Sequence, residues 1–480
     1  MLFSSKAEKF KDLILEVSSQ DSSSTLSLLG ANINEKYSQD LDVDYCKKSL
    51  KVDPQNAISH FNMGKALSVI GNIEAAIASF KKALSIKPDY AEVHYCMGNV
   101  MHDNGDLEGA IISYKKALRI QPDYAHAYNN MGNALKNKGE LGAAIVSYKQ
   151  ALKIKPNLTD TLNNLGHTLN QNGDTRAAME TFQQALNINP NYAATYKNIG
   201  SVLKENGNIE GALEAFKQAL NIEPDCATTY GKIGTAFMEM GNTEVAIEAF
   251  KQVLNIEPGH LIAQHILAAL TGKQTVSVPN NYIEELFDGY AAKFDDGLVK
   301  KLEYKLPKLI ADLISKYQTD VSIGSILDLG CGTGLAGVEL KEFCHNIEGI
   351  DLSKKMLTEA KRKNVYDTLN HTGIIEYLSE ATLDFDLFIA ADVFVYVGEL
   401  SEVFQLIKSR NKRKGMLVFS TEHTEKKGFF LEASERFSHS RGYIQSLCEE
   451  FDYKLLHFSK CNLRKEKGEI LTGGLYLLEF

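Results

Sequence analysis

The sequence predicts two folds in one chain: an all-α solenoid of repeats, followed by an α/β domain with a doubly wound sheet. Two observations predict this. Residues 325–334 read as a short buried strand, a tight glycine turn and the start of a helix. Upstream, seven of the nine prolines stand 34 residues apart, a period typical of stacked helical hairpins. These prolines are Pro54, Pro88, Pro122, Pro156, Pro190, Pro224 and Pro258.

Length and charge set bounds on the kind of protein. A chain of 480 residues exceeds what one hydrophobic core organises, so two or more domains are expected. The net charge of −9 gives no general positive field, and nucleic acid is therefore not an expected partner. No apolar run approaches the roughly 18 residues of a membrane span, so no membrane partner is expected either. Residues 1–20 are expected to form an amphipathic helix without a cleavage site.

The cysteines are scattered and odd in number. There are seven, and none belongs to a C-x-x-C pair. A disulfide framework or a zinc site is therefore not expected, and no metal-binding residues are predicted. The expected location is the reducing cytoplasm.

Each 34-residue unit repeats the same pattern of small and aromatic residues. Glycine recurs at Gly64, Gly98, Gly132, Gly166, Gly200 and Gly234. Alanine recurs at Ala76, Ala110, Ala144, Ala178, Ala212 and Ala246, and an aromatic follows four residues later. Small residues let two helices of a pair approach closely, the aromatic fills the space between pairs, and proline stops a helix. The pattern resembles the tetratricopeptide (TPR) repeat.

The repeat pattern sets the predicted domain limits. Six full repeats cover residues 57–260, a degraded repeat covers 23–56, and a capping helix covers 261–272. The array therefore spans residues 1–272. Residues 273–281, which are polar and without helical periodicity, are predicted to be a linker, and residues 282–480 to be the second domain.

One position on the first helix of the repeats holds asparagine at Asn62, Asn130, Asn164 and Asn198. Asparagine is a weaker helix former than alanine, so helix propensity alone does not explain its recurrence. The spacing resembles the asparagine ladder of the O-linked N-acetylglucosamine transferase repeats. That resemblance implies a protein or peptide partner on the concave face of the TPR array. The alternative is that these asparagines bridge neighbouring helices or are inherited with the repeat.

In the second domain, alternating strands and helices predict a parallel sheet with ligands at the carboxyl ends of its strands. A helix is expected at 335–343, a strand ending at Asp351, a helix at 353–363 and a third strand near Ile374. A fourth strand is expected at 385–394, a fifth at 415–420, and a last one at 474–480.

The glycine turn is suited to an anionic or polar ligand. Glycines at alternate positions let a ligand lie on the backbone, and the following helix presents exposed N–H groups. Gly330, Gly332 and Gly334 read G-x-G-x-G, and Asp328 precedes them by two residues. Asp351, 21 residues past Gly330, stands where a carboxylate can accept both hydroxyls of a ribose.

These residues resemble motif I and the second-strand acid of the class I S-adenosylmethionine (SAM) methyltransferases, which have a Rossmann-like fold. The resemblance implies SAM as the cofactor. The cofactor-binding residues it implies are Asp328, Gly330, Gly332, Gly334, Asp351 and Leu352, with Tyr290 as the aromatic of a lid segment. The acid that many family members place after the third strand to meet the adenine has no counterpart in residues 370–376.

Two residues after the fourth strand are the candidate catalytic residues. Asp392 stands at its carboxyl end, and Tyr396 follows in a sequence loosely similar to one lysine methyltransferase motif. The alternative is that Asp392 caps the next helix. Arg436 and His439 could reach the mouth of the site, but a solvent-facing histidine is the default expectation, and Glu422 and His423 face the same edge.

The predicted function is SAM-dependent methyl transfer, with the TPR array recruiting a protein or peptide, expected to be the substrate. One alternative is a small-molecule methyltransferase whose array serves assembly. A second is a non-catalytic TPR scaffold. An NAD-dependent oxidoreductase is disfavoured because its fingerprint is G-x-G-x-x-G.

Overall fold

The structure is a computed structural model that describes residues 39–291, 294, 295, 297, 302–317, 323–466 and 469–480. The chain forms two compact units that divide between Pro224 and Asp225. The amphipathic segment at 1–20 and the first part of the degraded repeat, with Gly30, lie outside the described residues. Because the two units divide within the repeats, the domain limit at residue 272 stays a proposal.

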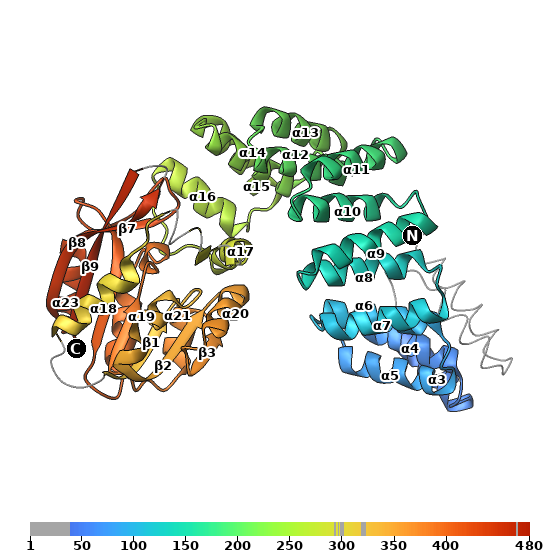
Figure 1. Cartoon of the computed structure of the whole chain (residues 1–480), viewed down its shortest axis with the longest axis horizontal. Helices are drawn as coiled ribbons and strands as arrows, with labels where there is room; N and C mark the ends of the chain where they lie inside the picture. The colour runs from blue at the N-terminus through green and yellow to red at the C-terminus, as the bar shows by residue number, and fades with distance from the viewer. Residues whose placement is uncertain (1–38, 292–293, 296, 298–301, 318–322, 467–468) are drawn as a thin grey trace, which may run out of the picture. The chain divides into compact units, whose positions relative to one another are not determined.

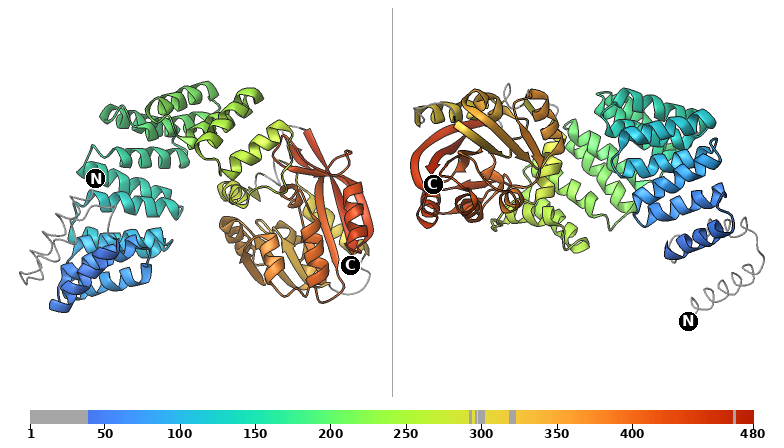
Figure 2. Two further views of the ribbon diagram at one scale, coloured as in Figure 1. Left: turned by 180° about the vertical axis from the view of Figure 1, so that it is seen from behind. Right: turned by 90° about the horizontal axis from the view of Figure 1, so that it is seen from below.

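The first unit consists of antiparallel helix pairs, which Figures 1 and 2 show stacked along the array. Its helices are α3 (Gln39–Val52), α4 (Ala57–Val69), α5 (Ile73–Ile86), α6 (Ala91–Asp103), α7 (Leu107–Ile120), α8 (Ala125–Asn137), α9 (Leu141–Ile154), α10 (Thr159–Gln171), α11 (Thr175–Ile188), α12 (Ala193–Glu205) and α13 (Ile209–Ile222). The repeat pattern continues in the second unit with α14 (Ala227–Glu239), α15 (Thr243–Ile256) and α16 (Leu261–Thr271).

The repeated glycine and aromatic residues pack against each other within each pair. A Cβ on Gly132 of α8 would lie 2.6 Å from the ring of Tyr148, which α9 carries and buries completely. Gly64 stands in the same way against Phe80. The aromatic therefore fills the interior of its own helix pair, where only glycine leaves room for the ring.

The second unit contains a nine-stranded sheet with helices on both faces. Its strand order is β3-β2-β1-β4-β5-β7-β6, and β9 pairs with both β5 and β8. The strands are β1 (Ile323–Leu329), β2 (Cys344–Asp351), β3 (Thr368–His371), β4 (Leu387–Ala390), β5 (Met416–His423), β6 (Phe429–Leu431), β7 (Phe437–His439), β8 (Lys454–Glu466) and β9 (Glu469–Glu479). The helices are α17 (Asn280–Tyr290), α18 (Leu306–Tyr317), α19 (Leu335–Leu340), η3 (Lys341–Phe343), α20 (Lys354–Lys363), α21 (Ile374–Glu380), η4 (Phe394–Tyr396), α22 (Ser401–Arg410) and α23 (Arg441–Glu450).

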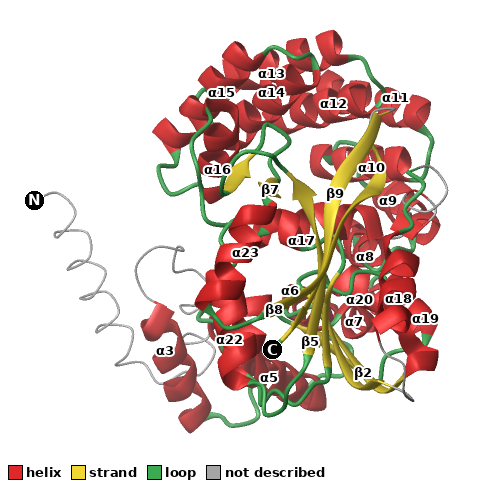
Figure 3. Cartoon of the chain, turned by 90° about the vertical axis from the view of Figure 1, so that its left-hand side faces the viewer, coloured by secondary structure: helices red, strands yellow, loops and turns green. Residues whose placement is uncertain are grey.

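Alternate residues of the central strands belong to two hydrophobic cores. Leu327 of β1 packs with α22 and α23, whereas Ile326 packs with α18 and α19. Figure 3 shows these helix pairs on opposite sides of the sheet. A strand covered on both faces reads as an unbroken apolar run, which explains why β1 and β4 were visible in the sequence. The predicted fold class, a helical repeat solenoid followed by a Rossmann-like domain, is confirmed.

Two local predictions were wrong. The third strand is β3, at Thr368–His371, whereas Ile374 is the first residue of α21. This strand pairs only with β2 and is partly exposed along its length, so it lacks the apolar pattern that marks the central strands. The helix expected to reach Phe343 ends at Leu340 and continues as the 3₁₀ turn η3.

The segment predicted to be a linker is bonded to the sheet domain. Val278 N–H donates to the Tyr396 carbonyl at 2.9 Å, and the Val276 carbonyl accepts from Gly398 N–H at 2.9 Å. Leu431 N–H donates to the Gln274 side chain at 2.8 Å. Residues 274–278 are therefore hydrogen-bonded to the loop that follows β4 and to β6.

Among the described residues, no helix combines the length and the apolar character needed to cross a membrane.

Candidate active site

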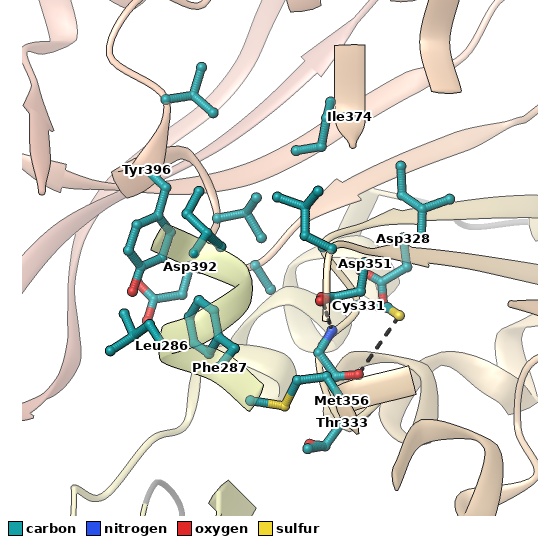
Figure 4. A pocket seen from close by; sticks show the side chains of 18 of the residues that line it. Leu286, Phe287, Asp328, Cys331, Thr333, Asp351, Met356, Ile374, Asp392 and Tyr396 are labelled. Atoms are coloured by element: carbon teal, nitrogen blue, oxygen red, sulfur yellow. Dashed lines mark hydrogen bonds between the residues drawn. The ribbon is translucent and has the colours of Figure 1, made fainter. Parts of the chain in front are cut away.

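A cavity of about 510 Å³ opens at the carboxyl ends of β1, β2 and β4. Figure 4 shows Asp328 and Asp351 on one side of it, with Asp392, Phe287 and Tyr396 on the other. The lid helix α17, the glycine turn and the start of α21 also line it. The position is the one expected for a ligand site in a doubly wound fold.

The glycine turn presents bare backbone to this cavity. Gly330, Gly332 and Gly334 have φ angles of 71°, 54° and 87°, which favour glycine. A Cβ on Gly330 would lie 2.7 Å from Val393, so that position has no room for a side chain. At Gly332 no atom of the described residues lies within 4 Å of the Cβ position, so its backbone faces space that a ligand can fill.

Asp351, at the end of β2, is held by the backbone of the turn. Its two oxygens accept from Gly332 N–H at 2.9 Å and Ser353 N–H at 2.8 Å. Burial raises the pKa of Asp351, and these two bonds oppose the rise. Each carboxylate oxygen has a second lone pair, so Asp351 can still accept hydroxyl groups from a ligand. Leu352 lines the cavity beside it.

Asp328 is buried and has one oxygen unpaired. Tyr366 donates its hydroxyl to Oδ2 at 2.7 Å, while Oδ1 has no hydrogen-bond partner in the described part of the chain. Burial raises the pKa of Asp328 to about 7, Tyr366 partly opposes this, and the charge of Asp351 adds to it. An orphaned buried acceptor at a cavity wall fits a ligand that brings a donor.

The lid segment is tied across the glycine turn by two carboxylates. Asp288 accepts from the Ser353 hydroxyl at 2.5 Å, at the first turn of α20. Asp295 accepts from the Thr333 hydroxyl at 2.5 Å and from Lys363 at 2.6 Å. These contacts hold α17 to α20, and Asp295 to the glycine turn, beside the cavity.

The aromatic residues of the lid differ in exposure. Tyr290 lines the cavity but is 61% exposed. Phe287, one turn earlier, stands edge-on to Tyr396 with ring centroids 5.5 Å apart, and edge-on to Phe294 at 6.0 Å. In the sequence, Phe287 and Tyr290 both stand at helical spacing in the lid segment. Spacing alone therefore does not predict which of the two rings lies deeper in the cavity.

Asp392 has a left-handed backbone, with a φ of 59°, and its side chain pairs with Arg464. It does not cap the next helix, because η4 begins after Val393 and has no side-chain cap. Tyr396 lies on η4 at the cavity wall. Burial and the nearby Asp392 carboxylate raise the pKa of Tyr396, so its hydroxyl keeps its proton.

Five charged residues form what we call the ion-pair cluster: Asp392, Glu422, Arg436, Arg464 and Glu466. The sequence pointed weakly to Glu422 and Arg436, and it missed Arg464 and Glu466. These two lie near the end of β8, 72 and 74 residues from Asp392, and no motif marks them.

His439 does not face solvent, contrary to the default expectation. It is fully buried and donates Nε2–H to the Gly398 carbonyl at 2.9 Å. Burial lowers the pKa of His439 to about 4, so the ring is neutral at physiological pH. It supports the loop after β4 and lies outside the cavity lining.

The asparagines of the array bond to neighbouring repeats. Asn130 donates to Asn99 Oδ1 at 2.8 Å, Asn164 to Asn129 Oδ1 at 3.3 Å, and Asn198 to Asn163 Oδ1 at 3.2 Å. Asn62 is buried. These asparagines therefore bridge neighbouring helices, which is one of the two alternatives that the sequence left open.

Comparison with known proteins identifies both parts. Profiles described as "TPR repeat" match residues 70–105, 98–139, 132–173 and 166–207, and "Tetratricopeptide repeat" profiles match 45–78 and 191–257. A profile described as "Methyltransferase domain" matches residues 321–470, which hold the glycine turn and all three cavity aspartates. The chain is a TPR array followed by a methyltransferase domain. The resemblance inferred from the sequence is thereby confirmed.

The methyltransferase domain is similar to curated O-methyltransferases. A malonyl-[acyl-carrier protein] O-methyltransferase of Halalkalibacterium halodurans is 31% identical over 159 residues, covering 31% of this chain and 55% of the relative. A ubiquinone biosynthesis O-methyltransferase of Rickettsia akari is 30% identical over 135 residues, covering 27% and 51%. The chain thus spans about half the length of the curated relatives it matches.

Solved structures match the repeats. YrrB, titled "a TPR protein with an unusual peptide-binding site", is 26% identical with a TM-score of 0.31, covering 39% of this chain and 96% of that one. MamA is 27% identical with the same TM-score, covering 35% and 92%.

Proposed function

We propose that the chain is a SAM-dependent methyltransferase. The observation that carries the proposal is the bare backbone at Gly332, open to a cavity that also holds the carboxylates of Asp328 and Asp351. A nucleoside with an amino-acid tail offers hydroxyl and ammonium donors to such carboxylates. A glycine turn without side chains leaves room for it.

The residues of the chain divide between holding the cofactor and serving the acceptor. Asp351 would accept the ribose hydroxyls, the glycine turn would lie along the amino-acid part, and Phe287 and Tyr290 would cover the site. Residues 372–376, which lead into the first turn of α21, line the cavity together with Leu352 and would enclose the adenine. When bound, SAM supplies a methyl group on a cationic sulfur that leaves as a neutral thioether.

Asp392 and Tyr396 would act on the acceptor. Catalysis of this kind needs few residues, because holding a nucleophile in line already lowers the barrier by about 7 to 11 kcal/mol in the best intramolecular examples. Asp392 would accept a proton from the acceptor, and the protonated Tyr396 hydroxyl would orient it.

Titration calorimetry tests the cofactor. The full chain should bind SAM and should not bind NAD. Asp351→Ala should weaken SAM binding by more than tenfold, because charge-assisted hydrogen bonds worth about 1.5 to 3 kcal/mol are lost. Asp312→Ala, an exposed aspartate on α18, is the matched control and should leave the affinity unchanged. Binding of NAD, or equal affinity in both variants, would contradict the assignment.

We further propose that the array brings a protein or peptide partner, the expected substrate, to the methyltransferase domain. TPR repeats are interaction modules, and tethering raises the local substrate concentration to about millimolar. The asparagine row stays the proposed partner-binding position. The ubiquinone biosynthesis relative favours the second candidate, a small-molecule methyltransferase whose array serves assembly.

The proposed location is the reducing cytoplasm, because the cysteines are scattered and odd in number.

A further inference from the structure

The ion-pair cluster stands in the wall of the cavity, on the side of Asp392. Arg464 pairs with Asp392 and reaches Glu422 Oε1 at 3.4 Å. Arg436 donates to Glu422 Oε1 at 2.6 Å and to Glu466 Oε2 at 2.6 Å. The side chains of Arg464 and Glu422 are 8% and 7% exposed, so the contact between them is shielded from water, whereas Glu466 at the edge of the cluster is 36% exposed.

The charges of this cluster do not balance. Three carboxylates face two guanidinium groups, which leaves one negative charge uncompensated when all five are ionised. Among the described residues that line the cavity, Arg436 and Arg464 are the only cationic side chains, and both are already paired. A carboxylate acceptor beside them would add a second unpartnered negative charge to this wall, which is costly next to the buried side chains of Arg464 and Glu422.

The cluster also has an unfilled hydrogen-bond acceptor. Asp392 Oδ1 is buried and has no partner within the described part of the chain, while Oδ2 is paired with Arg464. A buried acceptor left unpaired is destabilising, and a ligand that donates a hydrogen bond relieves this. Asp392 lines the cavity, so a ligand bound there can lie next to the side chain that carries this acceptor.

We propose that the methyl acceptor is a proton-bearing nucleophile, a hydroxyl or an amine, and not a carboxylate. This rests on the proposed function. The acceptor's lone pair forms the new C–O or C–N bond, the C–S bond breaks with its electron pair going to sulfur, and the acceptor's proton passes to the Asp392 carboxylate. Arg464 holds Asp392 in place for this role through their ion pair.

The stability of the product to alkali tests the proposal whatever the identity of the substrate. The full chain is incubated with methyl-labelled SAM and an extract of its source cells, and the labelled product is treated with mild base. Methyl ethers and N-methyl groups survive, whereas methyl esters release labelled methanol. We expect the label to survive. Release as methanol would overturn the proposal.

Failure of this inference is distinguishable from failure of the proposed function. If calorimetry detects no SAM binding, both fall. If SAM binds and the product is a base-labile ester, only the acceptor class is wrong.

A charge variant gives an independent readout by calorimetry. Phenol, benzylamine and benzoate serve as size-matched probes on the chain saturated with S-adenosylhomocysteine. Benzoate should bind at least tenfold more weakly than the other two. Glu466→Gln leaves two carboxylates facing the two guanidinium groups and should narrow the gap in affinity between benzoate and the other two probes. Glu469→Gln, at an exposed glutamate on the adjoining β9, should leave this gap unchanged. Benzoate as the tightest ligand, or equal effects of both variants, would overturn the proposal.

Discussion

Among single residues, Asp328 lies in the candidate site and also affects the stability of the fold. Its carboxyl is buried with one oxygen unpaired, and its pKa is raised from an ordinary value of 3.8 to about 7. Between about pH 4 and pH 7 the folded chain therefore holds a proton that the unfolded chain releases. The free energy of unfolding contributed by Asp328 falls as pH rises through this window.

Asp328→Asn should flatten this pH dependence. Asparagine stays neutral and can still accept from Tyr366, so the loss of stability between pH 5 and 8 should shrink by about 2 kcal/mol. Urea denaturation of the full chain, read at the transition of the methyltransferase domain, measures this. Asp312→Asn, on the surface of α18, should leave the pH dependence as it is. An equal slope in both variants would show that Asp328 does not titrate there.

Within the helices of the array, glycines differ in what surrounds them. As a result, replacing them with alanine should have opposite effects on stability. Gly132, in the middle of α8, touches the Tyr148 ring, whereas Gly142, in the first turn of α9, has nothing within 4 Å of its Cβ position. Both lie in helices, where alanine is intrinsically favoured over glycine by about 0.8 to 1 kcal/mol. The Tyr148 ring leaves no room for a side chain at Gly132, whereas Gly142 has room for one.

Alanine at these two positions should change stability in opposite directions. Gly132→Ala should destabilise the array by about 1 to 3 kcal/mol, because the new methyl group forces the α8–α9 pair apart. Gly142→Ala should stabilise it by up to about 1 kcal/mol. Urea denaturation followed by helical circular dichroism measures both. Stabilisation by Gly132→Ala would mean that the Tyr148 ring moves aside without cost.

Across the molecule as a whole, the last repeat helix belongs structurally to the methyltransferase unit. His265 of α16 is buried and donates Nε2–H to the Glu435 carbonyl at 3.0 Å, beside Arg436 of the ion-pair cluster. Ala268 and Ala269 pack with Val278, Leu431 and Phe437, and Tyr396 lies against the same group. The end of the repeat array therefore supports the side of the cavity that holds Asp392 and Tyr396.

Two truncations should behave differently for this reason. Residues 225–480, the second compact unit, should bind SAM as the full chain does. Residues 273–480, which begin at the predicted linker, lack α16 and should lose at least tenfold in affinity or fail to fold. Calorimetry and thermal melting compare the two. Equal affinity and equal stability would show that α16 is dispensable, and that residue 272 is a true domain limit.

The repeat array, the central strands and the side of the cavity formed by Asp328, the glycine turn and Asp351 can all be predicted from the sequence. The pattern of proline, glycine and aromatic residues recurs every 34 residues. Asp328, the glycine turn and Asp351 lie within a segment of 24 residues. Such signals are local: the turn geometry and the spacing of strand ends are set by neighbouring residues. Central strands that are buried on both faces can also be predicted, because their sequences are continuous apolar runs.

The side of the cavity that holds Asp392, in contrast, depends on contacts that form only when the chain folds. Asp392 meets Arg464 across 72 residues of sequence, and His265 meets Glu435 across 170. Arginine and glutamate are ordinary surface residues in a sequence, and nothing local reveals that folding buries them in one wall. The same holds for the predicted linker, whose polar composition suggested a free segment. Its backbone instead pairs with the loop after β4, because partners distant in sequence supply its hydrogen bonds.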